Sequence, residues 1–247
     1  MKKIKSWSRA IHIGLMTLFW LSILLLRQKM SPRKERSLAR FYKRKWAKRM
    51  LRILRIKVKV HGTIPELAEG FIITPNHRSH LDIPVVMSIF DCSMLSKAEV
   101  AEWPVIGIAA KAVGTIFVQR EDRNSRSASL EKIAHYLQEG YTINVFPEGT
   151  TYKSPEFGVF KPGVFNLANQ TGAYVIPIRI EYEDTAYEWV AEQTAFQHFF
   201  LKPGWSGTIV HVYVGEPIRP KESGVALKEA VEKWIQEAKI HNTSTYL

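Results

Sequence analysis

The chain has 247 residues, of which 46% are hydrophobic, so it can fill the core of one α/β domain with an appendage, which excludes wholesale disorder. Its single cysteine, Cys92, excludes a disulfide within the chain and fits a reducing compartment. The sequence has no Cys/His cluster with zinc spacing, no calcium loop, no P-loop and no dinucleotide-binding glycine pattern. We therefore expect neither a bound metal nor a cofactor.

The net charge of +12 is unevenly distributed along the chain. Residues 1–60 carry 19 Lys and Arg but a single acidic residue, Glu35, whereas residues 61–247 carry 16 basic and 22 acidic residues. The basic character therefore belongs to one end of the protein. A basic segment of this kind is expected to bind an anionic partner, either a lipid surface or a nucleic acid.

The first predicted element is an uncharged stretch at residues 10–26, with the sequence AIHIGLMTLFWLSILLL. As a helix it would extend about 25 Å, slightly less than the roughly 30 Å of a bilayer's hydrocarbon core. A cleavable signal peptide is the alternative, but RQKMSPRKER follows the stretch and offers no small-residue cleavage site. We therefore expect this stretch to attach the chain to a membrane, either by spanning it or by lying in one leaflet.

The second predicted element is a basic amphipathic helix over residues 33–57. Its apolar positions recur at spacings of three and four, and Lys and Arg fill much of the rest. These positions are Leu38, Phe41, Tyr42, Trp46, Met50, Ile53 and Leu54. Such a helix can pack on its own domain, or it can lie in one membrane leaflet with its cations among anionic headgroups. We favour the membrane, because nucleic-acid binding would leave the neighbouring apolar stretch unexplained.

These two elements define residues 1–60 as a helical membrane-attachment segment and residues 61–247 as the catalytic domain. Positive charge is denser after the apolar stretch than before it. By the positive-inside rule, the catalytic domain should therefore lie on the cytoplasmic side of the cell (inner) membrane.

From residue 61 onward, short apolar runs alternate with helical periods, which predicts an α/β domain. The predicted strands cover residues 71–74, 113–118, 142–146, 174–180 and 208–214. The predicted helices cover residues 81–89, 127–139, 164–171 and about 226–240. This alternation favours a mixed, largely parallel sheet flanked by helices.

Polar clusters follow the carboxyl ends of three of the predicted strands. They are NHRSHLD at 76–82, QR at 119–120 and PEGT at 147–150. Ligands of open α/β sheets bind outside the carboxyl ends of the strands. If these three strands are parallel and adjacent, the clusters converge on one cleft, whereas strands of alternating direction would separate them.

His77 and Asp82 are the candidate catalytic pair. A spacing of five does not place them on one face of a continuous helix, but they can meet if His77 lies in the loop and Asp82 in the first helical turn. An aspartate bonded to one imidazole nitrogen fixes the tautomer and leaves the other nitrogen to take a proton from an alcohol. The alternatives are a purely structural hydrogen bond, a helix-start role for Asp82, and a pair formed by His80 instead.

Three further charged residues are candidates for substrate binding. Arg120 can bind a phosphate with a charge-assisted fork, or it can pair with a neighbouring acidic residue at the surface. Glu148 precedes Gly149 at a strand end, where its carboxylate can bind a polyol, hold Arg120 in place or simply occupy a turn. Lys161 either adds positive charge or is solvated. A covalent serine mechanism has no support, because the sequence lacks G-x-S-x-G.

Four motifs resemble, in order, those of glycerolipid acyltransferases: NHRSHLD at 76–82, GTIFVQR at 114–120, FPEGT at 146–150 and VIPI at 175–178. A late VGEPI at 214–218 is also typical of that family. The order and spacing fit over residues 58–220, and the 1-acylglycerol-3-phosphate O-acyltransferases resemble this chain most. One departure is Thr151, which stands where family members often have Arg.

The resemblance implies transfer of a fatty acyl group from a thioester, acyl-CoA or acyl carrier protein, to the 2-hydroxyl of lysophosphatidic acid, giving phosphatidic acid. His77 would deprotonate the hydroxyl, Asp82 would stabilise the imidazolium, and no acyl-enzyme would form. In the family's second motif the arginine, here Arg120, binds the substrate phosphate. The other expected substrate contacts are Asn76, Ser79, Glu148, Gly149, Thr150 and Lys161.

Several alternatives remain open at this level. The acceptor can be glycerol 3-phosphate or another lysophospholipid, since the motifs do not define it. Water can replace the alcohol, which would make the protein a membrane-bound acyl hydrolase. The chain can also be a membrane-tethered binding domain without activity. In each case we expect membrane lipids, and no nucleic acid, as partners.

Overall fold

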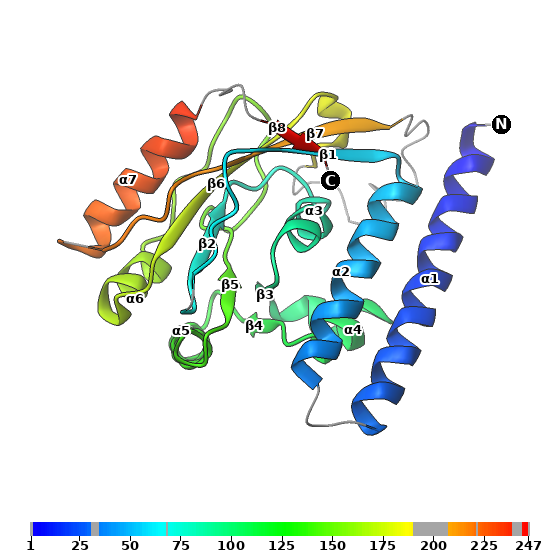
Figure 1. The fold of residues 1–247 in the computed structure, drawn as a ribbon, viewed down its shortest axis with the longest axis horizontal. Helices are drawn as coiled ribbons and strands as arrows, with labels where there is room; N and C mark the ends of the chain where they lie inside the picture. Colours follow the sequence, from blue (N-terminus) through cyan, green and yellow to red (C-terminus); the bar gives the residue numbers. More distant parts are fainter. Residues whose placement is uncertain are drawn as a thin grey trace.

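The computed structural model describes residues 2–30, 35–67, 69–189, 207–220, 222–238 and 244–246. Its centre is a sheet in the order β4-β3-β5-β2-β6-β7-β1-β8 (Figure 1). The strands are β1 (Ile56–His61), β2 (Ile72–Pro75), β3 (Cys92–Lys97), β4 (Ile116–Val118), β5 (Thr142–Asn144), β6 (Val175–Tyr182), β7 (Thr208–Val214) and β8 (Ser244–Tyr246). All neighbouring pairs from β4 to β6 are parallel, whereas β6–β7 and β1–β8 are antiparallel. The expected mixed, largely parallel sheet is therefore confirmed.

Helices cover both faces of this sheet. They are α1 (Lys2–Met30), α2 (Glu35–Ile53), α3 (Asp82–Ile89), α4 (Ile106–Ala112), α5 (Arg123–Gln138), α6 (Gly163–Thr171) and α7 (Gly224–Glu237). Successive residues of β2 show the two layers, because Ile73 packs into the cluster that contains α2 and α3, and Ile72 into the cluster of α5, α6 and α7. Side chains alternate across a strand, so a fully buried parallel strand serves two cores at once.

α1 and α2 lie side by side next to the sheet, α2 on α3 and α1 outermost (Figure 1). Within α1, residues Ile11–Met30 are long and apolar enough to cross a membrane, and only 22% of that window is buried. The indole Nε1 of Trp46 in α2 donates to Thr17 Oγ1 in α1 at 2.9 Å. The inner face of α2 joins the main core through Ala47 and Met50, so this face packs on the domain as an ordinary helix would.

The expected amphipathic helix over residues 33–57 is too long at its carboxyl end. α2 ends at Ile53, and Ile56 already begins β1, which pairs in parallel with β7. The reason is a change of period, because the sequence IKVKVH alternates apolar and basic residues and buries one side of a strand. The domain boundary expected after residue 60 falls inside this strand. The start of the expected helix, residues 33 and 34, lies outside the described residues.

Other elements differ from the prediction in detail. β3, α4, β8 and the short helices η2 (Ala98–Glu102) and η3 (Thr185–Tyr187) were not predicted. The strand expected from residue 113 begins only at Ile116, because Gly114 turns the chain out of α4 with φ +78°. α5 begins four residues early, at Arg123, because Asp122 caps its first turn by accepting from the N–H groups of Asn124 and Ser125. The end of the last predicted helix, residues 239 and 240, lies outside the described residues.

Candidate active site

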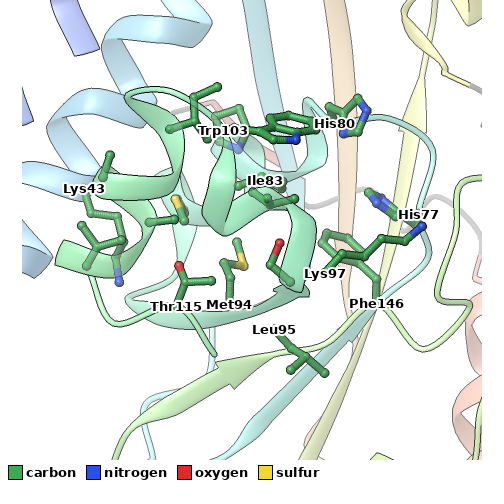
Figure 2. A pocket seen from close by; sticks show the side chains of 18 of the residues that line it. Lys43, His77, His80, Ile83, Met94, Leu95, Lys97, Trp103, Thr115 and Phe146 are labelled. Atoms are coloured by element: carbon green, nitrogen blue, oxygen red, sulfur yellow. The ribbon is translucent and has the colours of Figure 1, made fainter. Parts of the chain in front are cut away.

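The three polar clusters meet because the strands that carry them run in the same direction. β2 pairs with β5, β5 with β3 and β3 with β4, all in parallel. His77 after β2, Gly149 and Thr150 after β5, and Arg120 after β4 all line one cavity of about 1310 Å³. The expected convergence is therefore confirmed, although the three strands are not all adjacent, because the unpredicted β3 lies between β5 and β4. Figure 2 shows part of this cavity, with His77 beside Phe146.

Asp82 is the centre of a closed hydrogen-bond network around His77. Its Oδ2 lies 2.8 Å from His77 Nδ1 and also accepts from the backbone N–H groups of Arg78 at 2.6 Å and Ser79 at 2.9 Å. Its Oδ1 accepts from the hydroxyl of Tyr182 at 2.7 Å. The carboxylate is fully buried, so these donors replace the water that it would otherwise bind.

This network determines the chemistry of the imidazole. Because Nδ1 faces a carboxylate that only accepts, the neutral ring carries its proton on Nδ1, and Nε2 is the basic nitrogen. Phe146 stacks on the ring, with 4.0 Å between the centroids and 19° between the planes. Burial and the neighbouring Asp82 raise the pKa of Tyr182 well above its ordinary value, so the phenol stays protonated as a donor. The site thus holds an imidazole of fixed orientation, whose Nε2 is able to accept a proton.

His80 is not the partner of Asp82. Its ring lies against Trp189, with centroids 3.9 Å apart, and meets Trp103 edge to face at 6.4 Å. These aromatic rings line the cavity near His77. The pairing of His80 with Asp82, which the spacing left open, is therefore wrong.

Glu148 accepts two backbone hydrogen bonds that fix the loop carrying His77. Its Oε1 accepts from the N–H of His77 at 2.7 Å, and its Oε2 accepts from the N–H of Gly158 at 2.7 Å. Burial raises the pKa of Glu148, an effect opposed by these two hydrogen bonds and by the charge of Arg78. Glu148 is only 3% exposed and does not line the cavity, so its carboxylate is not placed to contact a substrate bound there.

Arg120 and Lys161 bring two cations to the same wall of the cavity. A guanidinium N–H of Arg120 donates to the carbonyl of Gly149. Gly149 adopts φ +75°, and a Cβ there would lie 3.0 Å from the Nζ of Lys161. Glycine is favoured here by the left-handed backbone, while the flexible end of Lys161 could move away from a Cβ. Burial lowers the pKa of Arg120, which Glu99 and Glu121 counteract.

Asn76 and Ser79 shape the loop and do not line the cavity. The amide of Asn76 accepts from the N–H of Ile180 at 2.6 Å and donates to its carbonyl at 3.1 Å, which ties the loop to β6. The hydroxyl of Ser79 accepts from the N–H of Leu81 at 3.3 Å. Both side chains are fully buried, so the substrate contact expected for them does not match their position. Sequence adjacency to His77 gave no information on side-chain direction.

Arg78 and Tyr182 belong to the site, but the sequence did not identify them. The guanidinium of Arg78 is 2% exposed, donates to the carbonyls of Tyr152 at 3.1 Å and of Glu156, and lies 4.4 Å over the ring of Phe157. The only available signal for Arg78 was its place next to His77. Tyr182 is 100 residues from Asp82, and no motif connects them.

The rest of the cavity is largely apolar and extends away from His77 toward the amino-terminal helices. Its wall includes Trp20 and Leu24 of α1, Met50 of α2, Met94 of β3 and Val113 beside α4. In Figure 2, Lys43 lies at the opposite side of the view from His77, and Thr115 and Met94 lie between them. Within the described ranges, no group of three His, Cys, Asp or Glu residues is placed to hold a metal ion.

The chain is similar to proteins of known function. The model of the family described as Acyltransferase matches residues 55–181. The lyso-ornithine lipid O-acyltransferase of Pseudomonas aeruginosa is 29% identical over 84% of this chain and 80% of its own length. The 1-acyl-sn-glycerol-3-phosphate acyltransferase of Neisseria meningitidis is 30% identical over 55% of this chain, which spans about half (53%) of that relative.

A solved structure shows the same fold over nearly the whole chain. The 1-acyl-sn-glycerophosphate (LPA) acyltransferase PlsC from Thermotoga maritima superposes with a TM-score of 0.73, at 24% identity, over 96% of this chain and 95% of its own. Since the family model covers the strands and loops that carry His77, Arg120 and Glu148, the chain belongs to the acyltransferase family.

Proposed function

We propose that the protein transfers a fatty acyl group from an acyl thioester to the sn-2 hydroxyl of 1-acylglycerol 3-phosphate, with His77 as the general base. The observation that carries this proposal is the 2.8 Å contact between His77 Nδ1 and the buried Asp82, in a cavity that combines cations with a long apolar wall. A relative named 1-acyl-sn-glycerol-3-phosphate acyltransferase supports the choice of acceptor.

The proton transfers follow from the geometry of the pair. Nε2 of His77 takes the proton of the 2-hydroxyl while the oxygen attacks the thioester carbonyl carbon. Asp82 stabilises the imidazolium that forms. The tetrahedral intermediate then collapses, the carbon–sulfur bond breaks, and the thiolate takes up the proton from Nε2. The new ester is formed directly, with no acyl-enzyme.

The two ends of the acceptor have different surroundings in the cavity. The phosphate would bind Arg120 and Lys161 beside Gly149. Hydrogen bonds between such ionised groups are stronger than those between neutral groups. Thr150 lines the same wall and offers a hydroxyl. The acyl chains would lie along the apolar wall toward α1 and α2. This separation matches a lysophospholipid, which has one charged and one apolar end.

Membrane attachment through residues 1–60 is part of the proposal. The outer side of α1 exposes large apolar residues, among them Leu15 at 63% and Phe19 at 58%, which water does not favour. The many cations of α2 would lie among anionic headgroups. The catalytic domain would then face the cytoplasm at the inner membrane, where acyl-CoA or acyl carrier protein can deliver the acyl group.

A second acceptor, lyso-ornithine lipid, is favoured by two specific observations. Thr151 stands where the resemblance leads us to expect an arginine, so one phosphate contact is missing. The relative that aligns over 84% of this chain is named for lyso-ornithine lipid. The same base would act on the hydroxyl of that acceptor, and only the headgroup contacts would differ.

An acceptor panel with the purified full-length chain tests both candidates. Lysophosphatidic acid, lyso-ornithine lipid and glycerol 3-phosphate are each offered with acyl-CoA and with acyl carrier protein thioester, and products are identified by mass. We expect phosphatidic acid to form fastest, and to be absent with His77→Ala. Faster acylation of lyso-ornithine lipid would favour the second candidate. Release of free fatty acid that no acceptor suppresses would contradict both.

A further inference from the structure

α4 is a short helix of unusual composition for a protein surface. Its sequence, IGIAAKA, contains one charged residue, Lys111. Ile106 is 49% exposed and Ile108 is 54% exposed, although they sit on different sides of the helix. Isolated exposed apolar residues are common, but two exposed isoleucines within one turn of a short helix point to a contact surface.

α4 lies against the helix that we assign to membrane attachment. The side-chain amide of Gln28, near the end of α1, donates to the carbonyl of Ala112 at 3.0 Å. Figure 1 shows α4 beside α1, at the end of the sheet where β3 and β4 lie. The exposed apolar residues of α1 are Ile11, Leu15, Leu18, Phe19, Leu25, Leu26 and Met30. The exposed apolar residues of α1 and those of α4 are thus carried by two helices in contact.

The active-site cavity opens between these two surfaces. Leu18 of α1 and Ile106 of α4 both line the cavity that contains His77, and both are strongly exposed, Leu18 at 44%. A residue that is exposed and also lines a cavity lies on its rim. On this side the rim is therefore formed by α1 and α4, and it is apolar at Leu18 and Ile106. Exposed basic lining residues, among them Lys97 and Lys161, form another part of the rim.

We propose that α4 is a second element that contacts the bilayer, so that the slot between Leu18 and Ile106 lies among the acyl chains. This inference rests on the membrane attachment stated under the proposed function. Exposure of the apolar part of the rim to water would be unfavourable, whereas contact with lipid tails is not.

The charges around the slot favour a lipid surface over a protein partner. Arg27 and Lys29 occupy the last turn of α1, and Lys111 the last turn of α4. Long basic side chains at the ends of apolar helices reach the headgroup layer while their stems stay among the acyl chains. The same arrangement on α4 and α1 places both carboxyl-terminal ends at the level of anionic headgroups.

Single-cysteine labelling measures the position of α4 directly. The native Cys92 does not compete for the label, because it is 1% exposed and burial raises the pKa of its thiol to about 12. Three full-length variants carry an environment-sensitive fluorophore: Ile108→Cys on α4, Leu18→Cys on α1, and Val225→Cys at the start of α7. Val225 is the matched control, because it is also 54% exposed but lies on the helix layer away from α1.

Each labelled protein is mixed with vesicles of phosphatidylethanolamine and phosphatidylglycerol, with and without lipids that carry a nitroxide quencher near the top of the acyl chain. We expect the probes at 108 and 18 to shift to the blue and to lose about half of their emission or more, since interfacial helices bury their apolar face about 5–10 Å deep. The probe at 225 should not respond to the quencher.

The outcomes separate this inference from the proposed function. Quenching at 18 without quenching at 108 would overturn the role of α4 and leave membrane attachment intact. No quenching at either position would overturn membrane attachment, and the role of α4 with it. A probe at 108 that is already shielded without vesicles, and becomes exposed on dilution, would show that a second copy of the chain covers α4, which also contradicts the proposal.

Discussion

The backbone N–H of His77 donates to Oε1 of Glu148 over 2.7 Å and so joins two sequence motifs that are 71 residues apart. The other oxygen of the same carboxylate accepts from the N–H of Gly158. Two N–H donors therefore share one acceptor group, and the loop that carries the base is fixed to the loop that follows β5. The position of His77 is therefore fixed by Glu148 through its backbone and by Asp82 through its ring.

Glu148→Gln should slow the reaction without weakening substrate binding. The amide has one oxygen and one NH₂ group, so one of the two backbone N–H groups would face another donor and lose its acceptor. A buried donor left unpaired costs about 1–3 kcal/mol, so we expect kcat to fall about tenfold or more and the thermal midpoint to drop. The measurement is kcat and acceptor KM on the folded variant. An unchanged kcat would show that Glu148 does not brace His77.

The stability of the wild-type chain relative to Glu148→Gln should depend on pH. Burial raises the pKa of Glu148, so the folded chain binds this proton at a higher pH than the unfolded chain, whose glutamates titrate near about 4.3. The free energy of unfolding of wild type, relative to the variant, should therefore decrease as pH rises through the interval between these two values. Denaturant unfolding across that interval checks the sign, and the opposite slope would contradict it.

Asp82→Asn should remove most of the activity while leaving the fold in place. The asparagine retains the size of the side chain but can present an NH₂ group to His77 Nδ1, which favours the wrong tautomer. In histidine–aspartate pairs of this kind such a change lowers kcat by roughly 10⁴-fold. Activity and circular dichroism are compared with those of Tyr182→Phe, which removes one donor to Asp82 and should cost far less. Equal losses in the two variants would argue against a tautomer effect.

Arg78 is expected to act as a positioning residue. Its guanidinium holds the carbonyls of Tyr152 and Glu156, and the N–H of Tyr152 in turn donates to the carbonyl of His77 at 3.0 Å. Arg78→Lys keeps the charge but has a shorter side chain, so we expect kcat to fall about tenfold through the loss of one buried hydrogen bond, with the acceptor KM unchanged. Arg78→Gln should lower kcat further, because it loses the positive charge as well.

The readout for Arg78 must exclude simple unfolding. Activity per folded molecule is therefore measured below the thermal midpoint of each variant, and the lysine variant should recover part of the rate that glutamine loses. A rise in acceptor KM with constant kcat would instead place Arg78 in the binding site, which its 2% exposure argues against.

Arg120→Ala and Lys161→Ala should raise the KM for a phosphate-bearing acceptor. A hydrogen bond to a charged group is worth about 1.5–3 kcal/mol, which corresponds to a change of about 10- to 100-fold. Arg120 should matter more, because it is partly buried and less screened by salt than the exposed Lys161. The matched control is Lys153→Ala, an exposed lysine on the same loop that does not line the cavity. An equal rise in KM for all three variants would indicate that positive charge attracts the acceptor non-specifically, without a defined phosphate site.

The largely parallel sheet and the pairing of His77 with Asp82 could be predicted from the sequence, but the order of the strands in the sheet could not. His77, Asp82 and Arg120 follow apolar runs of strand length, and the alternation of strands with helices predicts parallel pairing, which brings strand ends together. These features are local in the chain or repeat regularly along it. α4 and β3 were not predicted, because their apolar runs are short and show neither the helical nor the strand period clearly. The change from helix to strand at Ile56 was not predicted either, because α2 and β1 are both rich in basic residues.

The sequence by itself determined which polar residues follow three of the strands, and the spacing that lets His77 meet Asp82. Only the tertiary structure decided where each side chain points. Glu148 and Asn76 bind backbone instead of lining the cavity, and Tyr182 reaches Asp82 from β6 across 100 residues. The physical reason is that a buried polar group takes whichever partner the packing of distant strands brings within about 3 Å, and no local pattern encodes that distance.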